Sequence, residues 1–215
     1  MVQARGKSKK SELNSEDAKI SILDIARRHF ARHGFQGTNL KDVASDAGVA
    51  NSLINYHYGD KEGLFKACMS LFGQSRLDAI NRVLAEPKDA SELRVRLELF
   101  VEEMIVSVIS DPYGFEIIDH EIKLGNPIIV KLFQDTLLKG FKNVVEFFKQ
   151  AQRNGLIDPA LDPFIVAVLL FSATCDSSRK DLMGKTFFNV SLEEAEYRKK
   201  FTRHVVTIFL NGVVK

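Results

Sequence analysis

Two short helical patterns joined by a glycine turn, between Gly34 and Lys66, constrain the fold of this chain more than any other feature. In the first pattern four apolar residues recur at the i, i+3, i+4 and i+7 spacing of one helix face: Leu40, Val43, Ala44 and Ala47. Asn39 is placed to cap this helix, and Gly48 supplies the positive φ that ends it. The spacing therefore predicts a short helix, a tight turn and the start of a second helix.

The second helical pattern presents polar side chains beside a small apolar face. Val49 and Ile54 continue the apolar pattern, whereas the side chains between and after them are short or planar: Asn51, Ser52, Asn55, Tyr56 and His57. Such groups reach base edges and phosphates, and an asparagine can pair bidentately with adenine. The segment is thus predicted to be the recognition helix of a helix-turn-helix that binds DNA.

Several residue groups in this region occur in a fixed order and spacing: Gly34-Phe35, Thr38-Asn39, Val43-Ala44, Ala47-Gly48-Val49, Tyr56-His57-Tyr58, and Lys61-Glu62 with Leu64. Together they resemble the signature of the tetracycline-repressor (TetR) family, over a stretch from about Ile22 to Lys66. So many coincident positions are more specific than an isolated short motif. The resemblance implies an all-α protein, in which an N-terminal three-helix helix-turn-helix domain joins a C-terminal helical domain for ligand binding and dimerisation.

The resemblance also implies which residues contact DNA. Base or groove contacts fall on Asn51, Ser52, Leu53 and His57, and phosphate contacts fall on Asn39, Lys41, Tyr56 and Lys61, with Asn55 as a further DNA-binding candidate. The chain departs from the family at Ala50, where Ser or Thr is usual, and at Leu53 and Asn55, where Thr and Tyr are frequent. Without a hydroxyl at Ala50, Asn51 is a candidate for the helix cap as well as for reading a base.

Length and charge fit a small DNA-binding domain followed by a larger one. The chain has 215 residues, 45% of them hydrophobic, and residues 1–66 hold eleven Lys and Arg against eight Asp and Glu. We expect a disordered basic arm over residues 1–14, a helix-turn-helix domain over 15–66, and an effector-binding and dimerisation domain over 67–215. The arm carries Arg5, Lys7, Lys9 and Lys10, and either lies along DNA or is a solvated tail.

Periodicity and capping signals predict that the rest of the chain is helical. A first helix follows Ser15 and ends at Gly34, and others span about 60–85, 89–110 and 113–124. The helix at 89–110 places seven apolar residues on one stripe: Leu93, Leu97, Phe100, Val101, Met104, Ile105 and Val108. One long helix is expected from Asn126-Pro127 through Phe148. Another opens at Asp162-Pro163, and the last opens with a capping box, Ser191-x-x-Glu194.

The last two helices carry the predicted dimer interface. The stretch from Phe164 to Phe171 is apolar all round, which requires cover on both sides. Pairing both helices with their symmetry mates would form a four-helix interface, as in the resembled family. The predicted interface residues are Phe164, Val168, Phe171, Phe201, Val205 and Ile208. A two-fold homodimer of this kind predicts a near-palindromic DNA site.

The middle helices are where the resembled family binds a small effector. The candidate residues here are Phe100, Met104, Tyr113, Glu116, His120, Phe141 and Phe171. The aromatic ones can equally be ordinary core, and the cluster of Glu116, Asp119, His120 and Glu121 can equally be a solvated helix face. The effector itself, the operator, the regulated genes and the choice between repression and activation are not specified by the sequence.

Other function classes find little support. The chain lacks a nucleophile elbow, a phosphate-binding glycine loop and a metal-ligand spacing, so we expect no catalytic residues, no metal and no cofactor. Cys68 and Cys175 are far apart, and no apolar run is long enough to span a bilayer, which favours a reduced, cytoplasmic protein without membrane association. The alternatives are an architectural or division-control DNA-binding protein on the same fold and, last, a helical enzyme.

Overall fold

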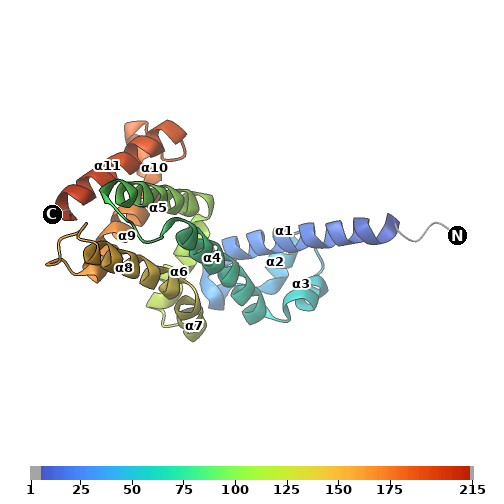
Figure 1. Ribbon diagram of the computed structural model, residues 1–215. Coiled ribbons are helices and arrows are strands. Elements are labelled where there is room, and N and C mark those ends of the chain that lie inside the picture. The colour runs from blue at the N-terminus through green and yellow to red at the C-terminus, as the bar shows by residue number, and fades with distance from the viewer. Residues whose placement is uncertain (1–5, 214–215) are drawn as a thin grey trace. The chain divides into compact units, whose positions relative to one another are not determined.

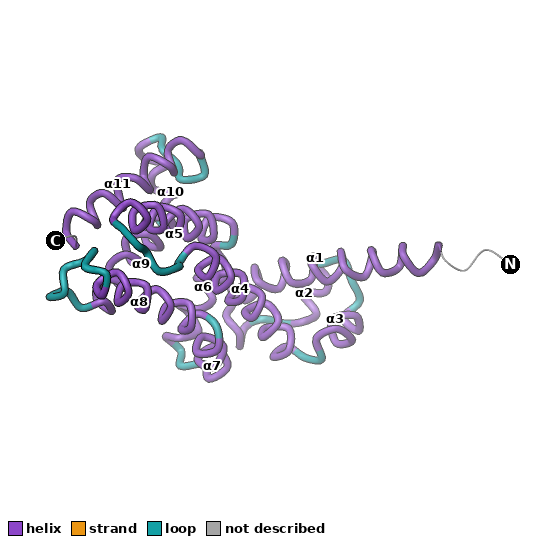
Figure 2. The backbone as a smooth tube through the Cα atoms, in the orientation of Figure 1, coloured by secondary structure: helices purple, strands orange, loops and turns teal. Residues whose placement is uncertain are grey.

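A computed structural model describes residues 6–213 of the chain, and within that range every regular element is a helix (Figures 1 and 2). The all-α fold predicted from the sequence is therefore confirmed. The elements are α1 (Gly6–Gly37), α2 (Leu40–Asp46), α3 (Asn51–Tyr58), α4 (Lys61–Val83), α5 (Ala90–Ser110), α6 (Pro112–Lys123), α7 (Pro127–Asp135), α8 (Leu137–Arg153), α9 (Pro163–Arg179), α10 (Asp181–Met183), the π-helical turn η1 (Gly184–Phe188) and α11 (Ala195–Val213).

The chain folds into two compact units. Unit 1 contains the chain up to Phe72 together with Tyr113–Leu132, and unit 2 contains Gly73–Pro112 and the chain from Phe133 onward. The chain passes between the units inside α4, at the start of α6 and inside α7. The functional boundary that we expect after residue 66 remains a prediction.

An aromatic core holds α1 and α4 of unit 1 together. Phe30 and Phe65 are fully buried, and their rings meet edge to face with centroids 5.0 Å apart. The Phe35 ring contacts the same Phe65 ring at 5.1 Å. Ala26 and Ile22, one and two turns before Phe30, are also buried, as the helical spacing of the first helix predicts.

The first helix begins earlier than the sequence suggests. α1 starts at Gly6, so its backbone includes residues 6–14 of the segment for which the composition predicts a basic arm. Residues 1–5 of that arm, with Arg5, lie outside the described residues. The expectation that the arm contacts DNA stays a prediction.

Unit 2 is built around α5, which packs against α9 and α11, while α8 packs against α9. All seven residues of the stripe predicted for this helix are buried: Leu93, Leu97, Phe100, Val101, Met104, Ile105 and Val108. From α11, Val206 and Leu210 are buried as well. A helix buried along so much of one face contributes to stability mainly through the apolar area it removes from water.

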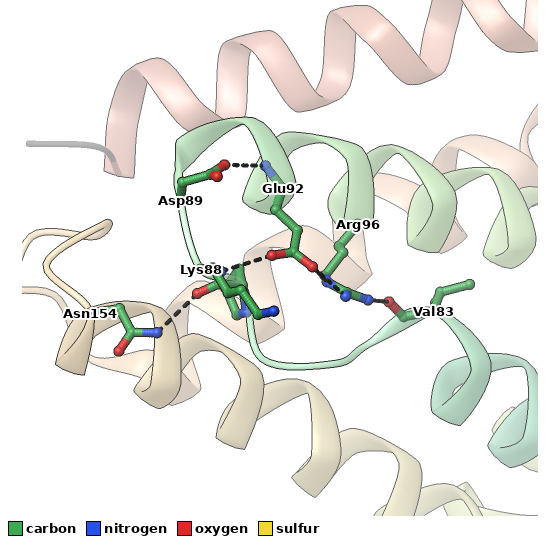
Figure 3. Close-up of polar contacts among 7 residues, drawn as sticks. Val83, Lys88, Asp89, Glu92, Arg96 and Asn154 are labelled. Atoms are coloured by element: carbon green, nitrogen blue, oxygen red, sulfur yellow. Dashed lines mark hydrogen bonds and ion pairs between the residues drawn. The ribbon is translucent and has the colours of Figure 1, made fainter.

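Polar contacts set the start of α5 (Figure 3). The Asp89 carboxylate caps the helix by accepting the Glu92 N–H at 2.8 Å, and Glu92 in turn accepts the Lys88 N–H at 3.0 Å. Arg96 pairs with Glu92 one turn further on and donates to the Val83 carbonyl at 3.1 Å. These contacts join the end of α4 to the beginning of α5 and satisfy N–H groups that a helix start leaves open.

The single long helix expected from Asn126 is wrong, because two helices, α7 and α8, occupy that stretch. The chain breaks at Thr136, whose backbone leaves the helical region at φ −128° and ψ −75°. Thr136 packs closely on Gly73, where an added Cβ would lie 2.3 Å from the Thr136 hydroxyl oxygen. Apolar period alone does not reveal such a break, because both halves keep their own helical spacing.

The predicted capping box at Ser191 is also wrong. The Ser191 hydroxyl donates to the Asp181 carboxylate at 3.0 Å and accepts the Glu193 N–H at 3.0 Å, while α11 begins only at Ala195. Asp181, ten residues earlier in the chain, thus makes Ser191 part of a turn before the helix.

None of the helices between residues 6 and 213 combines the length and the apolar character needed to cross a membrane.

We expect Gly114→Ala to destabilise the fold. In unit 1, Gly114 of α6 packs against the Phe72 ring, and an added Cβ would lie 2.0 Å from a ring carbon. Such overpacking costs about 1–3 kcal/mol, to be measured as a lower midpoint of thermal unfolding. Gly212→Ala is the matched control, since open space surrounds that position and alanine favours a helix. Equal melting of wild type and Gly114→Ala would contradict the close packing.

Candidate nucleic-acid interface

The amino end of α2 is formed as the sequence predicts. The Asn39 side-chain oxygen accepts the Lys41 N–H at 3.0 Å, which confirms Asn39 as the cap, and Asp42 lies in the first turn. Both Asn39 and Lys41 are exposed to solvent. A capped helix start presenting an amide and an ammonium suits a phosphate, because the helix dipole and the positive charge act in the same direction.

The turn between α2 and α3 fixes the second helix against the first. Gly48 has φ +66°, as predicted, and the next residue, Val49, donates its N–H to the Ala44 carbonyl at 3.0 Å. Ile54 of α3 and Val43 of α2 are both fully buried. Because Ile54 faces inward, the other side of the short helix α3 must face solvent.

The outward face of α3 holds the predicted base-reading residues. Ser52, Asn55 and Tyr56 are exposed, Tyr56 to 81%, while Leu53 and His57 are half-buried. The Tyr56 and His57 rings touch edge to face at 5.0 Å. An aromatic residue that is four-fifths exposed contributes little to the core, so its place on this face is accounted for better by binding than by packing.

Asn51 does not cap α3. The cap position is Ala50, which offers no side-chain hydrogen bond, and Asn51 is the first residue of the helix. Its side-chain oxygen is buried and accepts no hydrogen bond from the residues that the structure describes. A buried oxygen without a protein donor is expected to be satisfied from outside, by water or by a bound partner.

Lys61, at the start of α4, is tied to the turn before α2. Its ammonium donates to the carbonyls of Gln36 at 3.0 Å and Thr38 at 3.2 Å, and lies 4.9 Å from the centre of the Phe35 ring. An ammonium has three donors, so these two bonds leave one for a phosphate. Lys61 therefore braces the helix-turn-helix in addition to its predicted role on DNA.

Glu121 of α6 reaches the same turn from another direction. This carboxylate is only 2% exposed and accepts the Phe35 N–H at 2.7 Å, the Asn126 amide at 2.6 Å and a contact from His120 at 3.2 Å. Burial raises the pKa of Glu121, but the hydrogen bonds from Asn126, Phe35 and His120 lower it by more, so the pKa lies below its ordinary 4.5. The group is thus a buried anion at neutral pH.

Sequence reasoning treated Glu121 only as part of an acidic cluster at a pocket edge. The signal for a buried role was present, since Gly114, Ile117, Ile118 and Glu121 form the buried stripe of α6. A glutamate on the apolar stripe of a helix needs a hydrogen-bond partner, and its partner, Phe35, is 86 residues earlier in the chain.

The predicted effector residues are divided between the two units. In unit 2, Phe100 and Met104 are buried, and the Phe171 ring lies 5.7 Å from Phe100 and 5.6 Å from Phe141. Tyr113, Glu116 and His120 belong to α6 in unit 1, where His120 lies beside Gly34. Their role in binding an effector stays a prediction.

A hollow of unit 2 lies elsewhere, between α4 and α5. This groove has a volume of about 330 Å³ and is lined mostly by polar residues, which include Arg76, Arg82, Glu103, Ser107 and Ser110 but none of the predicted effector residues. Over residues 6–213, no three His, Cys, Asp or Glu side chains are grouped so as to hold a metal ion.

The predicted interface residues of α9 and α11 differ in exposure. Phe164 is 56% exposed, Val168 37% and Ile208 73%, whereas Phe171, Phe201 and Val205 are half-buried. Ile165 and Leu169 add to the exposed side of α9, while Val166, Ala167 and Leu170 are buried. One face of α9 is thus covered within unit 2, and the other is apolar and bare.

The geometry of α1 to α3 is that of a helix-turn-helix protein. Residues 22–68 match the family model described as bacterial regulatory proteins of the tetR family. This match confirms, over residues 22–68, the resemblance to the TetR signature that the sequence predicted.

The curated relatives are transcriptional regulators rather than enzymes. The HTH-type transcriptional regulatory protein RaaS of Mycobacterium tuberculosis is 28% identical over 148 residues, covering 68% of this chain and 62% of RaaS. The HTH-type transcriptional repressor AcnR of Corynebacterium glutamicum is 29% identical over 126 residues, covering 54% of this chain and 64% of AcnR. These alignments span less than two thirds of either relative.

Solved structures share the fold over almost the whole chain. The ketosteroid transcriptional regulator KstR2 of Mycobacterium tuberculosis superposes with a TM-score of 0.70 at 18% identity, covering 92% of this chain and 95% of KstR2. At this identity the likeness extends to the fold alone.

We expect Asn39→Ala to lower the free energy of unfolding by about 0.5–2 kcal/mol, because the start of α2 loses its cap. Chemical denaturation followed by circular dichroism measures the change. Asn55→Ala is the control, since Asn55 is exposed within α3, where alanine is the better helix former. If both variants unfold at the same denaturant concentration, the cap contributes nothing.

Proposed function

We propose that this protein is a DNA-binding transcriptional regulator that acts as a homodimer. We further propose that it represses transcription from a near-palindromic operator and leaves that operator when a small-molecule effector binds. Its place of action is then the cytoplasm, where the DNA is. The match of residues 22–68 to the tetR family model and the similarity of the chain to transcriptional regulators support the proposal.

The arrangement of α2 and α3 is the observation on which the proposal rests. The buried Ile54 anchors α3, and the opposite side presents Ser52, Asn55 and Tyr56 to solvent. Asn39 and Lys41 at the start of α2 supply groups suited to phosphates, which position the protein without reading sequence. The side chains of α3 would then read base edges in the major groove.

The bare face of α9 supports the homodimer. Phe164, Ile165 and Leu169 are each more than half exposed, and soluble monomers rarely leave such contiguous apolar side chains in water. A second copy of α9 and α11 would cover this face in an isologous interface. The two-fold axis would set two α3 helices about 34 Å apart, one helical turn of DNA.

Selection of bound fragments from genomic DNA tests the proposed function directly. A regulator should return a few related, near-palindromic sites, and its affinity should fall steeply with salt because lysine contacts release counterions. Many dispersed sites without a common sequence would favour an architectural or division-control protein. Operator affinity unchanged by every effector that binds would contradict the proposed release.

We expect His57→Ala and Asn51→Ala each to cost about 1–3 kcal/mol of binding on the selected site, because each removes a base or groove contact. Fluorescence anisotropy with specific and random duplexes measures both affinities. Lys41→Ala, the comparison variant, should weaken both duplexes nearly equally, because this exposed lysine is a predicted phosphate contact and a phosphate contact carries no sequence information. Footprints like those of the wild type for His57→Ala and Asn51→Ala would exclude these residues from base reading.

We expect Ile208→Glu to convert the dimer to a monomer, because it puts a charge in the proposed interface at a side chain that is 73% exposed. Analytical ultracentrifugation measures the association state. Val95→Glu is the matched control, at an apolar α5 residue that is 50% exposed and lies outside the proposed interface. A monomeric wild type, or a dimeric Ile208→Glu protein, would contradict the interface.

A further inference from the structure

A segment from the middle of the chain belongs to the DNA-binding unit. Tyr113–Leu132, which contains α6 and most of α7, is separated from Phe72 by forty residues and yet forms one compact unit with α1 to α3. Unit 2 is therefore joined to the reading helices by the chain at both ends of this segment, as well as through α4. The segment offers a covalent route from unit 2 to the reading helices that does not run along α4.

The contact that attaches the segment is a buried carboxylate. Glu121 accepts the Phe35 N–H and the Asn126 amide, with His120 as a third contact, and is 2% exposed. Gly34 lies so close that an added Cβ would come within 2.5 Å of a His120 ring carbon. A shift of α6 over the turn would therefore strain the hydrogen bonds of Glu121 to Phe35 and would require the His120 ring to move.

The turn that Glu121 holds, residues 34–38, opens the helix-turn-helix. Gly34 interrupts α1 with φ +66° and ψ 177°, and the Thr38 hydroxyl donates back to the Gly34 carbonyl at 2.7 Å. Lys61 bonds the carbonyls of Gln36 and Thr38 from the other side. The next residue is Asn39, the cap of α2, so a movement of the turn carries the start of α2 with it.

Loss of the Phe35 contact would leave a buried anion with fewer donors. Because the carboxylate is buried, displacement of α6 must either drag the turn along or leave the Phe35 N–H unpaired and Glu121 with only Asn126 and His120 as partners, and a lost hydrogen bond to a buried charge is costly. The turn is thus expected to follow α6.

We infer that Glu121 is a positioning residue for DNA reading, through which α6 sets the turn at residues 34–38 and thereby the start of α2, where we propose phosphate contacts. The inference rests on the proposed regulatory function. It identifies the contact between α6 and the turn as a route by which regulation reaches the reading helices, in addition to the connection through α4. Displacing Glu121 changes how α2 and α3 are presented together, so specific binding suffers more than general affinity for DNA.

Glu121→Gln in the full-length protein tests the inference, because the amide keeps the shape but removes the charge and one acceptor. Specific affinity for the selected operator should fall about tenfold or more, with little change on a random duplex of equal length. Hydrogen exchange of the amides at residues 35–43 should speed up, while α11 exchanges as in the wild type. Glu146→Gln, at an exposed glutamate of α8 to which no binding role is assigned, should match the wild type in every measurement.

Asn126→Asp is a second variant in case Glu121→Gln folds poorly. It keeps the oxygen that accepts the Ile128 N–H but replaces the amide donor to Glu121 with a like charge, so it should act in the same direction. Equal losses on specific and random DNA together with a lower melting point would mark a purely structural brace and overturn the inference.

The exchange experiment separates this inference from the proposed function. Amides at residues 35–43 that exchange at wild-type rates in both variants overturn the inference, whatever the DNA measurements give. A wild-type protein that selects no operator overturns the proposed function, while faster exchange confined to residues 35–43 would still support the link between Glu121 and the turn.

Discussion

The turn at residues 34–38 is the constraint on which the DNA-binding unit depends. Gly34 takes a positive φ there, which residues with a side chain rarely adopt, and an added Cβ would lie 2.5 Å from the His120 ring. The turn then receives one buried anion, Glu121, and one ammonium, Lys61, on different backbone groups. Charged partners on a short backbone segment fix its conformation more firmly than apolar packing, because hydrogen bonds to ions are directional and stronger than neutral ones. The position of α2, and through it of α3, follows from this turn.

In the recognition helix α3, one residue stabilises the fold and the others are available for binding. Ile54 accounts for the stability of α3 in its place, since it is fully buried against a core that also holds Val43. The outward residues add nothing comparable, because Tyr56 is mostly exposed and Asn51 keeps a buried oxygen without a donor in the described chain. Residues that folding does not require are the ones that binding can use.

In unit 2, the helices α5 and α9 likewise have a side that the fold buries, and α9 also has a side that it leaves exposed. α5 is buried on the stripe that its periodicity predicted, and α9 is buried on one side only, although its sequence from Phe164 to Phe171 is apolar all round. Helical periodicity identified the buried side of α5 because the apolar stripe of α5 is confined to one face. For α9 it indicated only that both sides need cover, and the fold shows that unit 2 covers one of them. The break at Thr136 escaped prediction because a close contact with Gly73, not a local signal, accompanies it.

The sequence by itself determined the helical class, the cap at Asn39, the positive φ at Gly48 and the likeness of residues 22–68 to the tetR family, since each depends on residues close to one another along the chain. Only the tertiary structure decided that Tyr113–Leu132 joins the DNA-binding unit and that Glu121 accepts a hydrogen bond from Phe35. It also decided that Ser191 donates a hydrogen bond to Asp181 instead of capping α11. These partners are separated by ten to nearly ninety residues. Helical periodicity and capping patterns describe neighbours along the chain, whereas a buried hydrogen bond is chosen by whichever donor the completed fold brings within reach.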